Sequence, residues 1–174
     1  AGNKGTGNWT TITTAELGVP STMIASALFA RYASFYKEER IAASAHFKSK
    51  NISKLNITND AILKAYCFAR IMNHYQGFKL IQEASKSYKW ELNLSELARI
   101  WTNGCIIKSD LMADLVAIFK TTNNLLTNEQ IIQQIQTLKP SIKKVVSEGV
   151  LNELPIPILS ESISFLNNFS VANS

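Results

Sequence analysis

The sequence predicts an all-α protein built from several helices, two of them long. Apolar residues recur at helical spacing along most of the chain, and no run of alternating polar and apolar residues bounded by hairpin turns stands out. Only 7 glycines and 4 prolines interrupt the 174 residues, of which 46% are hydrophobic and 18% are charged. This composition is typical of one packed globular domain and excludes a disordered chain.

Three helices are expected in the first half of the chain. A short one covers residues 7–17 and ends at Gly18, which has no Cβ and can adopt the left-handed conformation that terminates helices. Pro20 suits the first turn of the next helix, a long one at 20–46. A second long helix covers 58–88 and begins at a threonine–asparagine pair, either of which can cap it.

Shorter helices follow in the second half. They are expected at 95–101, 106–120, 129–138 and 141–147. Gly149 ends the last of these, and Pro157 begins a final helix.

One short pattern occurs twice. Residues 16–20 (ELGVP) are matched by 153–157 (ELPIP), and each copy follows a short helix and precedes a longer apolar one. Chance could produce so short a match, but the shared helix–turn–helix context favours two similar helical halves packed together. The expected fold is therefore an all-α, multi-helix domain with an internal duplication.

Charge and composition limit the partners of the chain. The net charge of +5 favours an anionic partner, but no dense lysine and arginine tract indicates nucleic acid. The most apolar stretch, 19–36, contains Arg31 and several polar residues, so no membrane span is expected. Cys67 and Cys105 lie in apolar helical patterns without a cysteine or histidine cluster, so we expect buried, reduced thiols in the cytoplasm and no metal site.

The KGTG segment at the start of the chain has features of an anion site. A helix begins just after it, and the first turn of a helix exposes unpaired N–H groups. Lys4 supplies a positive charge, Thr6 a hydroxyl donor, and Gly5 and Gly7 allow a ligand to approach the backbone closely. Taken alone, KGTG is a weak motif, and a loop with a capping threonine is the favoured interpretation of this segment.

Arg31 is a second candidate for an anion site. It is the one strong charge inside the apolar run 19–36, where a guanidinium without a partner would be costly. The partner is either a carboxylate of the chain or a phosphate held by both arms of the guanidinium. The candidate carboxylates are Glu16, Asp110 and Asp114.

Further motifs occur in a specific order along the chain. After 4–10 and 17–20 come FAR at 29–31, an ER–AS pattern at 39–44, YQGF at 75–78, a W–GCII pattern at 101–107 and SF at 164–165. In this order and spacing they resemble the C-terminal helical domain of the 6-phosphogluconate dehydrogenases. The resemblance covers nearly the whole chain.

The resemblance implies roles for individual residues. In the family, the lysine and threonine of KGTG and the arginine of the long helix hold the phosphate of the substrate. These positions correspond to Lys4, Thr6 and Arg31, and we add Gly5 and Ile106 as further candidates for substrate binding.

The resemblance also implies an activity of the whole enzyme. The family oxidises 6-phosphogluconate with NADP and releases carbon dioxide, which gives ribulose 5-phosphate in the pentose phosphate pathway without a metal. Its catalytic base and acid and its nucleotide-binding domain lie outside this segment. We therefore expect residues 1–174 to form a substrate-binding and dimerisation domain, cut at both ends, with no catalytic residue and no activity alone.

Some features leave alternatives open. Asn8 and Lys108 stand where the family usually has lysine and arginine, which affects accessory contacts at most. The expected partner is a second copy of the chain, although the family's C-terminal tail, which enters the partner subunit, lies beyond this segment. The alternative function is a free-standing helical module that recruits an acidic partner.

Overall fold

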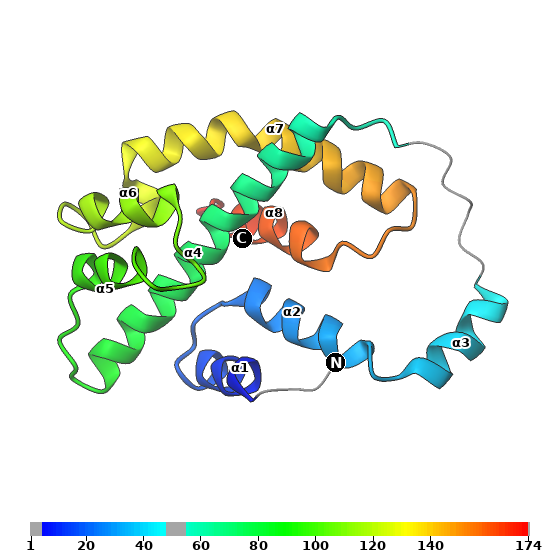
Figure 1. The fold of residues 1–174 in the computed structure, drawn as a ribbon, viewed down its shortest axis with the longest axis horizontal. Helices are drawn as coiled ribbons and strands as arrows, with labels where there is room; N and C mark the ends of the chain where they lie inside the picture. Colours follow the sequence, from blue (N-terminus) through cyan, green and yellow to red (C-terminus); the bar gives the residue numbers. More distant parts are fainter. Residues whose placement is uncertain (1–4, 48–54, 174) are drawn as a thin grey trace.

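The computed structural model describes residues 5–47 and 55–173. Within these ranges the chain forms eight α-helices and one short 3₁₀ helix (Figure 1). The described ranges contain no strand, so the predicted all-α class is confirmed. The 3₁₀ helix, Leu125–Thr127, was not expected from the sequence.

Helix α4 (Asn59–Ser87) is the central element and crosses the molecule diagonally in Figure 1. With 29 residues it is about 44 Å long. The side chain of Thr58 accepts a hydrogen bond from the backbone N–H of Ala61 at 3.1 Å, which caps the helix start. The second long helix and its cap are therefore confirmed.

The core lies where α7 (Glu129–Leu151) and α8 (Pro157–Phe169) pack against α4. Two short helices, α5 (Leu94–Trp101) and α6 (Asp110–Ile118), pack against each other and contribute to the same core. The largest fully buried apolar side chains are Met23, Phe68, Met72, Met112, Leu115, Leu125, Ile131 and Ile142.

Helix α7 corrects the prediction of two separate helices at 129–138 and 141–147. It is one helix that continues through Pro140, which is exposed, and through Gly149, which is buried. Helical spacing places its buried residues on a single face toward α4, so one continuous helix buries more apolar surface than two short ones. These residues are Ile131, Ile135, Ile142 and Val145.

Gly149 therefore does not end a helix, contrary to the prediction. A Cβ at this position would collide with the side chain of Ile156, the residue before α8. The glycine allows the end of α7 and the start of α8 to approach closely. The final helix begins at Pro157, as predicted.

The long helix predicted at 20–46 is wrong. The structure has two helices, α2 (Thr22–Ala33) and α3 (Lys37–His46), separated by a turn. The Ser34 backbone N–H and hydroxyl both donate to the Arg31 carbonyl, at 3.2 Å and 2.6 Å, so the last turn tightens to i+3 bonding and the helix ends. No residue of α3 is buried, so tertiary packing does not hold the two helices in line.

The helix predicted at 106–120 is shorter in the structure. Helix α6 begins only at Asp110, because Ser109 caps it by accepting a hydrogen bond from the backbone N–H of Met112 at 3.2 Å. Ile106 consequently lies in the turn before the helix, with a fully exposed side chain (100%).

The repeated pattern lies at two comparable turns. The first joins α1 (Thr6–Glu16) to α2, the second joins α7 to α8, and α2 and α8 pack together. The residue with positive φ is Gly18 in the first turn and Glu153 in the second, which are the third and the first residues of the two patterns. The two turns therefore differ in register, and the internal duplication stays a prediction.

Candidate functional site

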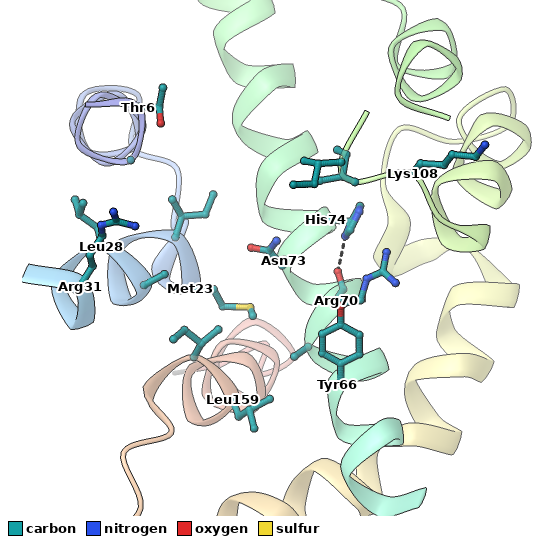
Figure 2. Close-up of a pocket in the computed structure, with 17 residues that line it drawn as sticks. Thr6, Met23, Leu28, Arg31, Tyr66, Arg70, Asn73, His74, Lys108 and Leu159 are labelled. Carbon is teal, nitrogen blue, oxygen red and sulfur yellow. Dashed lines mark hydrogen bonds between the residues drawn. The ribbon is translucent and has the colours of Figure 1, made fainter. Parts of the chain in front are cut away.

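A cleft of about 960 Å³ opens between the first two helices and α4. Its walls come from α1, α2, α4, α8 and the turn before α6 (Figure 2). Among the residues predicted from the sequence, Thr6, Arg31 and Ile106 line this one cleft. Gly5 directly precedes Thr6 but is not part of the lining, and Lys4 lies outside the described residues.

The start of α1 forms one end of the cleft wall. Gly5 precedes the helix with a φ of 89°, a conformation that favours glycine, and a Cβ there would lie 3.3 Å from the Trp9 ring. Thr6 is the first helical residue and is exposed. No acidic side chain occupies the first turn, so the positive end of the helix dipole is not neutralised within α1.

Arg31 lies near the end of α2, and its side chain is exposed at the cleft. The expectation of a costly buried charge is therefore wrong, because α2 leaves much of this face open to solvent. Figure 2 shows Arg31 and Thr6 on the wall opposite α4. Asp110 and Asp114, two of the carboxylates considered as partners, line a different cavity together with Cys67 and Leu138.

Helix α4 supplies the opposite wall, which sequence reasoning missed. Tyr66, Arg70, Asn73 and His74 line the cleft from this helix, and Lys108 lines it from the turn before α6. The spacing of 66, 70, 73 and 74 places these side chains on one face of a helix, which is the signal that could have found them. The Arg70 guanidinium lies 5.7 Å from the centre of the Tyr66 ring.

The charge of the cleft is positive. Arg31, Arg70 and Lys108 line it, and none of the described lining residues is an aspartate or a glutamate. In Figure 2, Asn73 extends from α4 toward the wall that carries Arg31, whereas the side chains of Arg70 and Lys108 lie farther from that wall. Both the α2 wall and the α4 wall of the cleft therefore carry positive charge.

His74 does not add to this charge at neutral pH. Its Nδ1 lies 2.7 Å from the Arg70 carbonyl oxygen, which can only accept, so Nδ1 carries the proton. Burial lowers the pKa of His74 below its ordinary value of 6.5, the nearby charge of Arg70 lowers it further, and the bond to the Arg70 carbonyl opposes both effects. Its Nε2 is buried and accepts from no described residue of the protein.

Other chemistry-bearing residues are dispersed. Cys67 and Cys105 are free thiols. Both are half-buried, whereas the sequence predicts that they are buried. Among the described residues no three His, Cys, Asp or Glu side chains come together as metal ligands. No helix in the described ranges combines the length and the apolar character that crossing a bilayer requires.

The whole chain matches a known protein family. The family described as "6-phosphogluconate dehydrogenase, C-terminal domain" matches residues 1–174. The chain belongs to this family. The family resemblance expected from the sequence is therefore confirmed.

Relatives within the 6-phosphogluconate dehydrogenase family support this membership. The decarboxylating 6-phosphogluconate dehydrogenase of Lactococcus lactis is 34% identical over 99% of this chain, and that of Dictyostelium discoideum is 32% identical over 99%. The Plasmodium falciparum 6-phosphogluconate dehydrogenase, described with its cofactor NADP+ and its substrate 6-phosphogluconate, superposes with a TM-score of 0.94 at 31% identity over 100% of the chain. The chain spans 38%, 37% and 39% of these three proteins, respectively.

Proposed function

We propose that this chain is the substrate-binding and dimerisation domain of an NADP-dependent enzyme that oxidatively decarboxylates 6-phosphogluconate to ribulose 5-phosphate. Family membership over residues 1–174 supports the reaction class, and the positive cleft supports an anionic substrate. The NADP site, the catalytic base and the catalytic acid belong to another part of that enzyme. This part corresponds to the region of the relatives that the chain does not span. For the chain alone we expect no NADPH formation from 6-phosphogluconate and NADP+, measured by absorbance.

The cleft binds the phosphate group of the substrate between Thr6 and Arg31. What supports this is that the first residue of α1 and a residue near the end of α2 line the same cleft. The N–H groups at the start of α1 point along the helix dipole toward an anion, Thr6 adds a hydroxyl donor, and the Arg31 guanidinium can donate two parallel bonds. Lys4, which directly precedes Gly5, adds a further charge, and Gly5 and Ile106 are accessory contacts.

Substitution of the two phosphate-binding side chains tests this proposal. We expect Arg31→Gln and Thr6→Val each to weaken binding of 6-phosphogluconate by about 1.5–3 kcal/mol and about 0.5–1.5 kcal/mol, respectively, in calorimetric or NMR titrations. The matched control is Arg99→Gln, which removes an exposed guanidinium that is paired with Glu96 at 2.8 Å on α5. Equal affinity of Arg31→Gln and the wild type for 6-phosphogluconate would contradict the proposal. A wild-type chain that binds an acidic peptide but not 6-phosphogluconate would favour the interaction module.

A second copy of the chain covers the α2–α3 arm. This arm exposes large apolar side chains that a single copy leaves in water, and Figure 1 shows α3 extending away from the other helices. The exposed residues are Phe29 (58%), Phe35 (46%), Tyr36 (58%), Ile41 (59%) and Phe47 (82%). An interface of this composition fits a lasting homodimer, in which apolar surface dominates.

A further inference from the structure

The first turn of α2 has no capping side chain of its own. Ser21 occupies the position before the helix, but it makes no capping hydrogen bond, and its buried hydroxyl oxygen has no partner among the described residues. The first turn also contains no acidic residue. A buried helix start needs partners for its backbone N–H groups, so they must come from elsewhere in the fold.

Gln76, on α4, supplies the missing partner. Its side-chain oxygen accepts a hydrogen bond from the backbone N–H of Met23 at 3.0 Å, and its nitrogen donates to the Thr22 hydroxyl at 3.3 Å. The Gln76 side chain is 1% exposed, and Met23 is 2% exposed. An amide is suited to this place because it accepts and donates from one group.

We infer that Gln76 is a positioning residue for the substrate cleft: by capping α2 from α4, it sets the position of Arg31. The inference rests on the proposed role of Arg31 in phosphate binding. Arg31 follows Met23 by eight residues, about 12 Å along the helix axis, so any shift or rotation at the start of α2 is carried to the guanidinium.

The position of Gln76 in α4 connects the two walls of the cleft. Asn73 and His74, which line the cleft from α4, precede Gln76 by three and two residues. Met23, to which Gln76 bonds, lines the cleft from α2. One buried side chain thus joins the wall that carries Arg31 to the wall that faces it.

Two substitutions at Gln76 separate this role from simple packing. Gln76→Met keeps the length of the side chain and leaves the Met23 N–H buried without a partner. In Gln76→Glu the buried carboxyl group is favoured in its protonated form, whose C=O accepts from the Met23 N–H and whose O–H donates to the Thr22 hydroxyl. The control is Ile142→Val, which removes one buried methylene from α7, a helix that does not carry Arg31.

The test measures amide hydrogen exchange and titrates the complete chain with phosphate. NMR detects both, under conditions where all variants are folded. In Gln76→Met we expect the Met23 amide to exchange about tenfold faster, the Arg31 Nε–H signal to shift, and phosphate affinity to fall about tenfold. Gln76→Glu and Ile142→Val should keep all three readouts near the wild-type values.

Two results would overturn the inference: unchanged Met23 protection in Gln76→Met, or equal losses of affinity in Gln76→Met and Ile142→Val. A wild-type chain that binds no phosphate would instead overturn the proposed anion site. In that case the exchange of Met23 and the Arg31 signal, which need no ligand, still decide whether Gln76 positions α2.

Discussion

At the scale of single residues, the cleft combines side chains whose roles depend on what surrounds them. The sequence predicted that Thr6, Arg31 and Ile106 belong to one site, and the structure places all three along the same cleft. It did not predict Asn73 or Arg70, because helical spacing reveals which residues share a face but not which element lies opposite that face. The neighbours of α4 are set by long-range packing.

His74 links this wall of the cleft to pH. Because its pKa is lowered in the folded state, the folded protein binds fewer protons than the unfolded chain as the pH falls below 6.5. The free energy of unfolding should therefore decrease between about pH 7.5 and about pH 5.5. Chemical denaturation at the two pH values should show a smaller decrease in His74→Gln than in the wild type.

A second group with a lowered pKa titrates in a different pH range from His74. Hydrogen bonds from Lys79 and Lys86 lower the pKa of Glu83 below its ordinary value of 4.5. Protonation of Glu83 therefore affects the free energy of unfolding at a lower pH than protonation of His74 does. An equal decrease in His74→Gln and wild type would show that His74 is not the group responsible.

At the scale of helices, the local sequence rules succeed for some elements and fail for α7 and for the turn after α2. Thr58, Pro157 and the short α5 helix follow the local rules and were predicted. The continuous α7 was not, because the apolar face that spans Pro140 is worth more than the hydrogen bond that the proline removes. The turn after α2 was also missed, because it contains no glycine or proline and the helix ends through the bonds of Ser34 to the Arg31 carbonyl.

Pro140 is therefore expected to weaken α7. It is exposed and inside the helix, so Pro140→Ala restores a backbone donor and should raise the free energy of unfolding by about 1–3 kcal/mol in chemical denaturation. Lys143→Ala, one turn further on at an exposed position, is the control and should change stability by less than about 0.5 kcal/mol. A loss of stability in Pro140→Ala would mean that packing on α4 requires the proline.

At the scale of the whole molecule, the helical class was predictable from the sequence, but the exposed α2–α3 arm was not. The all-α class followed directly from the sequence, because helical periodicity belongs to each segment and does not depend on which segments pack together. The arm did not, since the sequence predicts one continuous helix at 20–46, whereas the structure ends α2 at Ala33 and leaves no residue of α3 buried.

Dimerisation is the property expected of this arm. Sedimentation analysis should give the mass of a dimer for the wild type, and Ile41→Asp should shift the equilibrium to monomer by placing a charge in the apolar interface. Leu151→Asp changes an apolar residue at the end of α7 that is more exposed than Ile41 (73% against 59%) and should leave the dimer intact. A wild-type monomer at every concentration would refute the proposed interface.

Thr6 and Arg31, from two different helices, are proposed to bind one phosphate group. A crystal structure of this chain with 6-phosphogluconate tests it most directly. We expect the phosphate to accept hydrogen bonds from the start of α1, the Thr6 hydroxyl and the Arg31 guanidinium. A phosphate held instead by Arg70 and Lys108, with Thr6 and Arg31 free of ligand, would contradict the claim.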